Sequence, residues 1–494
     1  MTRHLHYIHY FVFPLVYANA PVRRPLEKTF PLNFKFGAGS SSYQIEGAWN
    51  VSDKGESIQD RYAHEHPEKV VDGSNGDVAC DSYNLWRRDI EMATELGLDH
   101  YRFSISWPRL LPSGYPNYIS EDGRNYYNNL IDGLLKNNIE PVITIYHYEL
   151  PQVFQDLGGW TNPLIVDWFA DYASVVYSLF ADRVKIWLTV NEPLIICDVS
   201  YIGISAPGLY SPDHGLFLCN KHVLLAHAKA WRLYDEEYKP KYHGMVSLTQ
   251  LFFWFEPETE ADSELAELTN EYCEGRFAYP IYSKEGGWPP ALKNILDENS
   301  YNKGFNNTRV LQFTPEEIEF VKGTYDFYAL NHYTSFVVKA IEPNEAAGDW
   351  PFSGSSELGV NFGPHPTWEV SAGFGIYPPG LRRQLNWLKN RYGDIPFMIT
   401  ETGYASYPFH GLNDDGRINF IKDYLNEVLL AIYEDKINVT GYTVWSLMDS
   451  YEWESGYTAK YGLYQVDFES PNKTRTPRKS AKYYADLIKN RALL

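Results

Sequence analysis

Two glutamates, Glu192 and Glu401, each close an apolar stretch that is typical of a buried β-strand; these stretches cover residues 185–191 and 395–400. A carboxyl group at a buried strand end needs a partner or a chemical role, because an unpaired buried charge is costly. Two such groups in one pocket suit glycosidic bond cleavage, in which one carboxyl protonates the leaving oxygen and the other attacks the sugar carbon. Taken alone, each glutamate is better explained as a helix cap or an ion-pair partner.

The elements that would position these carboxyls alternate regularly along the chain. Short apolar runs alternate eight times with amphipathic stretches, which predicts parallel strands joined by crossover helices. We therefore expect residues 21–494 to form one α/β domain, a (β/α)₈ TIM barrel with long loops after its strands. The predicted strands are Phe34–Gly39, His100–Trp107, Pro141–His147, Val184–Val190, Gly244–Phe255, Asp326–Tyr333, Pro396–Thr400 and Thr440–Leu447. The predicted helices include Ser82–Leu96, Arg124–Asn137, Leu164–Phe180, His222–Tyr238, Gly380–Arg391, Gly416–Tyr433 and Arg478–Arg491.

Polar side chains follow most of the predicted strands. Barrel enzymes build their sites at the C-terminal ends of the strands, so these side chains are expected to meet at one mouth. In chain order they are Gln44, Arg102, His147 with Tyr148, Asn191 with Glu192, Asn331 with Tyr333, Glu401, and Trp445 with Glu452 and Trp453. Their convergence is harder to explain by packing than any one of them is.

Composition and charge exclude several classes of function. The formal net charge of −20 argues against nucleic-acid and anionic-membrane partners, because both recruit basic patches. The aromatic content of 16% suits either sugar-ring recognition or a core of large side chains. No His, Asp or Glu cluster has the spacing of metal ligands, so we expect neither a metal nor another cofactor. The sequence leaves open whether the protein is a monomer or a homodimer.

The first 20 residues resemble a secretory signal peptide. Arg3 and His4 precede a mostly apolar stretch, which ends at Ala18-Asn-Ala20. Four Asn-x-Ser/Thr sequons fit a secreted, extracellular glycoprotein, at Asn50, Asn306, Asn438 and Asn472. Beyond the N-terminus, no stretch is long and apolar enough to span a bilayer. The sequence thus predicts secretion.

The four cysteines are too widely spaced for a disulfide scaffold or a common zinc cluster. Cys197 and Cys219 flank one predicted loop. A bridge between them stays open, and the alternative is that all four cysteines are buried thiols.

Five motifs, in order, resemble glycoside hydrolase family 1, the retaining β-glucosidase family. They are Phe36-Gly-Ala-Gly-Ser-Ser-Ser-Tyr-Gln44-Ile-Glu-Gly-Ala-Trp49, Tyr101-Arg102-Phe-Ser-Ile-Ser-Trp107, Thr189-Val-Asn191-Glu192-Pro193, Ile399-Thr-Glu401-Thr-Gly403 and Trp445-Ser-Leu-Met-Asp-Ser-Tyr-Glu452-Trp453. The resemblance extends over about residues 30–488. Within the family, the sequence resembles secreted insect members, including myrosinase-like ones.

The resemblance implies roles for the catalytic group. Glu192 corresponds to the acid/base and Glu401 to the nucleophile, with Arg102 and Tyr333 as the partners of Glu401 and Asn191 beside them. Physically, Glu401 must be ionised to attack, which requires a nearby cation. Glu192 must be protonated in the free enzyme, and both burial and the charge of Glu401 would raise its pKa. A retaining enzyme holds its two carboxyl groups about 5 Å apart.

The resemblance also implies a sugar site, with Trp445 as a stacking platform and Gln44 and Glu452 binding adjacent sugar hydroxyls. His147, Asn191 and Trp453 complete it. The chain departs from the family pattern where His147-Tyr148-Glu149-Leu-Pro151 replaces His-Trp-Asp-Leu-Pro, so that Tyr148 offers a hydroxyl in place of a sugar-contacting indole N–H. Thr402, Ser450 and Tyr451 also depart from it, but none of these changes removes a catalytic carboxyl.

Three readings of function follow. The first is a retaining β-glucosidase acting on small glucosides or oligosaccharides, and the second is a thioglucosidase acting on glucosinolates. Plant thioglucosidases that resemble this family carry glutamine at the acid/base position, whereas insect ones that resemble this chain retain the glutamate. Asp198, close to Glu192, argues against an anionic aglycone. The third reading is an inactive sugar-binding barrel, which usually lacks one of the two glutamates.

Overall fold

The computed structural model describes residues 28–407 and 411–493, so the predicted signal peptide lies outside the described residues. Eight parallel strands form a closed barrel in the order β1-β14-β13-β7-β5-β4-β3-β2, which confirms the predicted TIM barrel. The barrel strands are β1 (Lys35–Gly39), β2 (His100–Ser104), β3 (Glu140–Tyr146), β4 (Ile186–Asn191), β5 (Met245–Leu251), β7 (Tyr328–Asn331), β13 (Phe397–Thr402) and β14 (Val439–Trp445).

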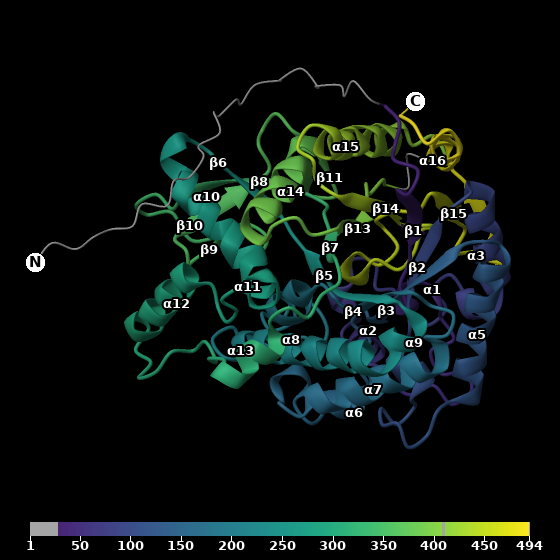
Figure 1. The fold of residues 1–494 in the computed structure, drawn as a ribbon, viewed down its shortest axis with the longest axis horizontal. Coiled ribbons are helices and arrows are strands. Elements are labelled where there is room, and N and C mark those ends of the chain that lie inside the picture. The colour runs from purple at the N-terminus through teal and green to yellow at the C-terminus, as the bar shows by residue number, and fades with distance from the viewer. Residues whose placement is uncertain (1–27, 408–410, 494) are drawn as a thin grey trace, which may run out of the picture.

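Helices surround this barrel (Figure 1). The long ones are α3 (Ser82–Leu96), α5 (Glu121–Lys136), α7 (Ile165–Phe180), α8 (Gly215–Leu233), α14 (Pro378–Tyr392), α15 (Asp415–Tyr433) and α16 (Lys479–Asn490). Helix α16 packs between α15 and α3, so the C-terminal helix closes the outer ring beside the first one. The sequence predicted both ends of α3 correctly. It predicted the ends of most of the other long helices to within one turn.

Local sequence signals set several of the helix ends. Ser120 caps α5 by accepting a hydrogen bond from the Gly123 N–H, and Glu121 and Asp122 lie in its first turn, where negative charge is favourable. Helix α3 ends at Gly97, whose φ of 70° is a conformation that glycine adopts without steric cost.

The prediction of one long strand over Gly244–Phe255 is wrong. Strand β5 ends at Leu251, and β6 (Trp254–Pro257) belongs to a second sheet of order β6-β8-β10-β9. The other strands of this sheet are β8 (Ser335–Ala340), β9 (Gly354–Ser355) and β10 (Val360–Gly363). Both halves of the predicted strand are buried, so the apolar run gave no sign of the break between them.

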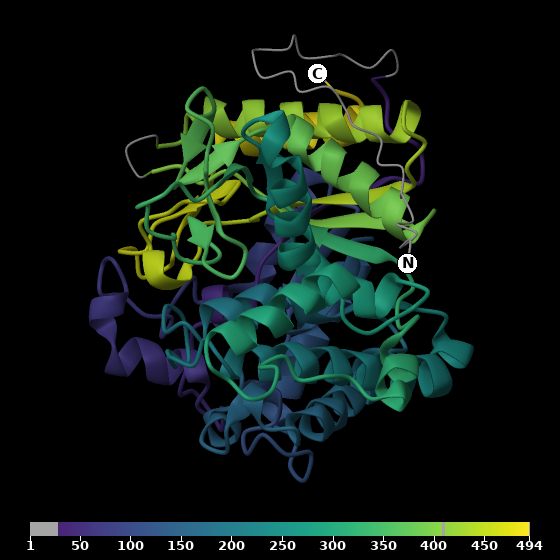
Figure 2. The same cartoon turned by 90° about the vertical axis from the view of Figure 1, so that its left-hand side faces the viewer.

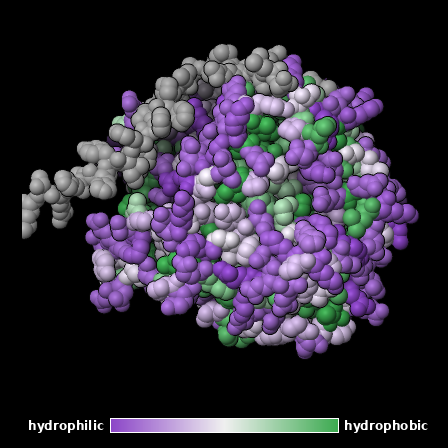
Figure 3. Space-filling view, in the orientation of Figure 1, coloured by the Kyte–Doolittle hydropathy of each residue, from purple (hydrophilic) through white to green (hydrophobic). Residues whose placement is uncertain are grey.

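The connections after the barrel strands gather at one end of the molecule, on the left of Figure 2, together with the second sheet and α2 (Ile58–Glu65). Most of the core lies between the barrel and its helices. A smaller apolar cluster, formed by Val142, Leu188, Phe327, Ala329 and Met398, is separate from it. On the face seen in Figure 3, hydrophobic residues lie in patches among hydrophilic ones.

Cys197 and Cys219 form a disulfide, which decides the alternative left open by the sequence. It joins a short π-helix after β4, Ile195–Val199, to helix α8. Cys80 and Cys273 are buried thiols. The bridge therefore anchors the segment that directly follows Glu192.

Asp198, next to this disulfide, is fully buried and forms an ion pair with Arg276 at the start of α11 (Arg276–Tyr282). Its carboxylate also accepts a hydrogen bond from the Trp350 Nε1–H (2.6 Å), and Asn220 accepts one from Arg276 (2.9 Å). The expectation that Asp198 opposes an anionic aglycone is thus wrong, because its charge is neutralised inside the protein.

We expect Arg276→Met to destabilise the fold strongly. The variant leaves the Asp198 charge buried and uncompensated, which typically costs about 3–5 kcal/mol. Calorimetry would measure the midpoint of thermal unfolding. Arg88→Met is the matched control, because it breaks partly exposed ion pairs with Glu91 and Glu95, worth about 0–1 kcal/mol, and a distant cation–π contact with Tyr464. Equal midpoints for the two variants would contradict this interpretation.

Candidate active site

Glu401 lies near the end of β13, where its carboxylate contacts Arg102 and Tyr333. The Tyr333 hydroxyl donates to Oε2 at 2.7 Å, and the Arg102 guanidinium forms an ion pair with Oε1. Two residues on, Gly403 lets the backbone pass close to Trp445, since a Cβ there would lie 2.2 Å from the Trp445 carbonyl oxygen. The local sequence thus holds the Glu401 carboxylate between a cation and a hydroxyl donor at the barrel mouth.

Arg102 on β2 is completely buried, and each group that contacts its guanidinium accepts a hydrogen bond from it. Besides Glu401, it donates to the Thr144 hydroxyl (3.1 Å), the Thr400 carbonyl (3.0 Å) and Asn191 Oδ1 (2.7 Å). Since arginine carries donors and no acceptor, the Asn191 side-chain oxygen must face Arg102. Arg102 therefore orients the residue before Glu192 as well as holding Glu401.

The orientation of Asn191 sets the direction of the next hydrogen bonds. Its amide nitrogen faces the Tyr148 hydroxyl at 3.0 Å and His147 Nε2 at 3.3 Å. Because Asn191 supplies a hydrogen to the Tyr148 oxygen, the Tyr148 hydroxyl donates its own hydrogen to Glu192 Oε2. A chain of hydrogen bonds thus runs from Arg102 through the side chains of Asn191 and Tyr148 to Glu192.

Glu192 directly follows β4 and has a left-handed backbone with φ of 49°, a conformation that is costly for a residue other than glycine. Its other carboxylate oxygen accepts a hydrogen bond from Asn331 at 2.7 Å. Burial, and then the nearby charge of Glu401, raise the Glu192 pKa from 4.5 to about 8. Glu192 is therefore mostly protonated at neutral pH. The 5 Å separation stays a prediction.

Gln44 and Glu452 lie side by side at the mouth. The Gln44 amide donates to Glu452 Oε2 at 3.2 Å and to the Tyr451 carbonyl at 2.8 Å, while Ser41 donates to its oxygen at 2.6 Å. Ser450 donates to the other Glu452 oxygen at 2.8 Å. Desolvation raises the Glu452 pKa to about 8. These two side chains form one polar unit, as the sugar-binding prediction requires.

Aromatic rings adjoin this unit. The His147 ring is nearly parallel to Trp445 (centroids 5.7 Å apart) and to Trp453 (6.2 Å), and Tyr148 lies against Trp453 at 5.1 Å. His147 Nδ1 is buried without a hydrogen-bond partner among the described residues. Burial also lowers the pKa of this histidine well below its usual value. A neutral ring with an unused N–H fits a ligand hydroxyl better than it fits a satisfied core histidine.

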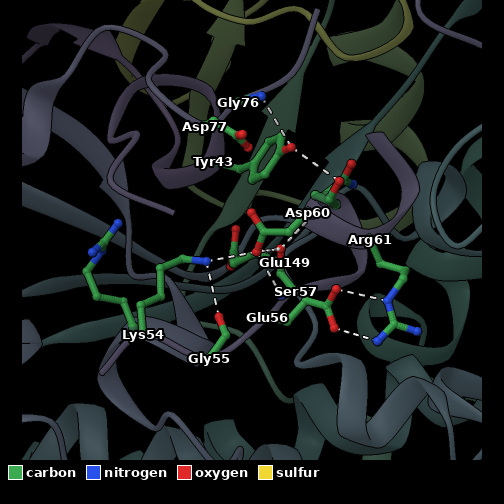
Figure 4. A network of polar contacts seen from close by, with 12 residues as sticks. Tyr43, Lys54, Gly55, Glu56, Ser57, Asp60, Arg61, Gly76, Asp77 and Glu149 are labelled. Atoms are coloured by element: carbon green, nitrogen blue, oxygen red, sulfur yellow. Dashed lines mark hydrogen bonds and ion pairs between the residues drawn. The ribbon is translucent and has the colours of Figure 1, made fainter. Parts of the chain in front are cut away.

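Tyr43 supports Trp453 from behind. Its ring is stacked on the indole at 6.1 Å with 10° between the planes. The Tyr43 hydroxyl accepts a hydrogen bond from the Gly76 N–H (3.3 Å) and donates to the Gln59 carbonyl (3.2 Å), as Figure 4 shows for Gly76. Sequence reasoning missed this residue, although it directly precedes Gln44.

Helix α2 carries Gln59, whose carbonyl accepts the hydrogen bond from Tyr43. Ser57 and Asp60 form its capping box, and Lys54 donates to the same Asp60 oxygen at 2.8 Å (Figure 4). Sequence reasoning assigned no role to this pair. A Ser followed three residues later by an acid is a capping signal that could have located the helix start.

The structure brings together the predicted residues Gln44, Arg102, His147, Tyr148, Asn191, Glu192, Tyr333, Glu401, Trp445, Glu452 and Trp453 through the contacts described above. Tyr148 is the exception in role, because its hydroxyl contacts Glu192. Asn331 was noted at a strand end without a role, and it contacts Glu192 directly. The four sequon asparagines are all exposed.

Within residues 28–407 and 411–493, no three His, Cys, Asp or Glu side chains are grouped so that they could hold a metal ion. No helix in the same two ranges has the length and hydropathy that a membrane span requires.

The sequence pattern of glycosyl hydrolase family 1 matches residues 26–493. Myrosinase 1 of Brevicoryne brassicae is 43% identical over 94% of this chain and 99% of its own. A human cytosolic β-glucosidase is 37% identical over 94% and 99%. Among solved structures, aphid myrosinase has a TM-score of 0.89 at 43% identity, covering 94% of this chain and 100% of that one. A family 1 β-glucosidase from Thermotoga maritima has 0.83 at 33%, covering 95% and 100%.

Glu192 is expected to titrate with a pKa near 8 in the free protein, protonated below and ionised above. Difference infrared spectra of wild type against Glu192→Gln would isolate its carboxylic-acid band, which should fade as the pH rises through 8.

Glu401→Gln should lower this Glu192 pKa, because the second cause of the shift is lost. In this variant the Glu192 pKa should stay above 4.5, because burial, the larger cause of its rise, remains. A midpoint that does not respond to Glu401→Gln would show that the two carboxyls are not electrostatically coupled.

Proposed function

Because the chain belongs to glycosyl hydrolase family 1, we propose that its site hydrolyses the terminal bond of β-glucosides with retention, Glu401 acting as nucleophile and Glu192 as acid/base. The chain is a glycoside hydrolase with β-glucosidases among its relatives. The observation that carries the assignment of roles is the contrast between the two carboxyls. Glu401 contacts a cation, and Glu192 accepts hydrogen bonds from neutral donors.

The first step joins Glu401 to the sugar. Its ionised oxygen attacks the anomeric carbon, the bond to the aglycone oxygen breaks, and that oxygen takes the proton of Glu192. Arg102 and Tyr333 hold the attacking carboxylate in place before the reaction. A raised pKa keeps Glu192 protonated at neutral pH, which this step requires.

The second step frees the sugar. Once Glu401 is an ester, it carries no negative charge, so one of the two causes that raise the Glu192 pKa is gone. Ionised Glu192 takes a proton from water, the hydroxide oxygen bonds to the anomeric carbon, and Glu401 leaves as a carboxylate. Each of the two steps inverts the configuration of the anomeric carbon, so the product retains the configuration of the substrate.

Sugar recognition follows from the polar unit of Gln44 and Glu452. The side chains are adjacent and each can bond to two neighbouring hydroxyls, which suits the 3-, 4- and 6-positions of a terminal sugar. His147 supplies a further ring nitrogen, and Trp445 supplies an aromatic face for the C–H face of the sugar.

A thioglucosidase is the second candidate. Its support is the similarity to a relative named Myrosinase 1, and the ion pair that removes the Asp198 charge from consideration. An inactive sugar-binding barrel is the third reading. It gives no reason for one buried carboxyl paired with a cation and a second one whose pKa is raised.

We also propose that the protein is secreted and N-glycosylated. The disulfide between Cys197 and Cys219 and the exposure of Asn50, Asn306, Asn438 and Asn472 support this proposal. Treatment of the protein secreted by insect cells with an N-glycosidase should lower its mass. An unchanged mass would count against glycosylation, and retention in the cells against secretion.

The proposed function is tested by hydrolysis of aryl β-glucosides, aryl β-galactosides and the glucosinolate sinigrin by wild type, Glu401→Gln and Glu192→Gln. Wild type should cleave the aryl β-glucoside. Glu401→Gln should abolish turnover, because no nucleophile remains. Glu192→Gln should lose about 10²–10⁴-fold on alkyl glucosides, which need the acid, and less on activated aryl glucosides.

Glu274→Gln is the matched control, since this buried glutamate has no hydrogen-bond partner among the described residues and lies outside the site. It should keep full activity. Sinigrin turnover would move the assignment to the thioglucosidase, and a folded protein inactive on the whole panel would favour the sugar-binding reading.

A further inference from the structure

Tyr148 contacts the proposed acid/base directly. It follows β3 with a φ of 81°, which is strained for a tyrosine, and this backbone directs its buried side chain toward Glu192. The ring lies against Trp453, with the centroids 5.1 Å apart. The hydroxyl contacts both Asn191 and Glu192. This geometry differs from the sugar contact expected at the position.

Both oxygens of Glu192 meet a hydrogen-bond donor. Tyr148 donates to Oε2, and Asn331 donates to Oε1 at 2.7 Å. The direction of the Tyr148 bond follows from the chain of orientations that starts at Arg102 and passes through Asn191. A carboxylate accepts on both oxygens, whereas a protonated carboxyl must donate from one of them. The donor pattern therefore complements the ionised form of Glu192.

We propose that Tyr148 is a positioning residue that favours the ionised, base form of Glu192 and thereby biases the enzyme toward glucosides of acidic aglycones, such as phenols and thiols. The inference rests on the proposed function. With such an aglycone, the bond from the anomeric carbon to oxygen or sulfur breaks as Glu401 attacks, and the anion takes its proton from solvent. Glu192 is then already ionised for the second step, in which it takes a proton from water.

Other groups around Glu192 act in both directions. Burial and Glu401 on β13 favour the protonated form, while Arg102 on β2 and the two hydrogen bonds favour the ionised form. Tyr333, after β7, keeps its hydroxyl protonated because burial and Glu401 raise its pKa. His147 is neutral. Tyr148 is the contact that differs from the family pattern, so its contribution can be varied without removing a carboxyl.

Tyr148→Phe and 3-fluorotyrosine at position 148 test the proposal in opposite directions. Loss of the donor should move the alkaline limb of kcat/KM for an alkyl β-glucoside upward by about one pH unit. A fluorinated ring is a stronger donor of nearly the same shape, so it should move the limb downward. At about pH 9, Tyr148→Phe should raise the ratio of alkyl to aryl kcat/KM roughly fivefold, as expected for a one-unit move from 8 to 9.

Tyr146→Phe is the matched control, because it removes a buried hydroxyl that accepts a hydrogen bond from Trp160. It should leave the alkaline limb in place. Limbs that stay unmoved in both Tyr148 proteins, or that move in the same direction, would overturn the proposal. Should Tyr148→Phe fail to fold, the fluorinated protein decides alone.

A separate measurement keeps this result distinct from the proposed function. A 2-deoxy-2-fluoro aryl β-glucoside should label the peptide that contains Glu401 in wild type. Labelling without a shift in the limb would reject the role of Tyr148 alone. Absence of both labelling and turnover in wild type would reject the proposed function, and with it this inference.

Discussion

The buried ion pair between Arg102 and Glu401 is the interaction on which the site depends. A guanidinium group can only donate, and Arg102 is completely buried, so each contact it makes has one allowed direction. That restriction orients Asn191, then Tyr148, and through them one oxygen of Glu192. A single cation inside the barrel thus fixes the geometry of two carboxyls on different strands.

The difference between the two carboxyls comes from their surroundings, since both are glutamates at the same barrel mouth. Glu401 has a cation beside it, whereas Glu192 accepts hydrogen bonds from the neutral side chains of Tyr148 and Asn331 and lies close to Glu401. Burial strengthens both effects, because charges interact more strongly away from water. Different surroundings can thus give one residue type two chemical roles, which is the usual origin of acid and nucleophile pairs.

The sequence predicted what depends on local pattern or on charge balance. Amphipathic spacing located α3. The need of an ionised carboxylate called for a cation near Glu401, and the family resemblance identified that cation as Arg102, which forms the ion pair. The break between β5 and β6 could not be predicted, because residues 251–255 across it are all apolar and all buried. The role of Asn331 and the direction of the Tyr148 hydroxyl depend on side-chain orientations relayed between strands distant in sequence. An asparagine at a strand end carries no such information by itself.

The network around Asp198 joins three segments that leave the barrel at different points. Asp198 lies after β4, Arg276 begins α11 after β6, and Trp350 lies in the connection between β8 and β9. The loops that we expect to enclose the aglycone, residues 200–220, 257–272 and 340–370, adjoin or include these three residues. Such loops are usually regarded as interchangeable modules on a constant scaffold. Here a graft of one loop from a relative would sever a buried charge pair or its indole contact, so new aglycone preferences are more readily engineered by exchanging all three segments as one cassette.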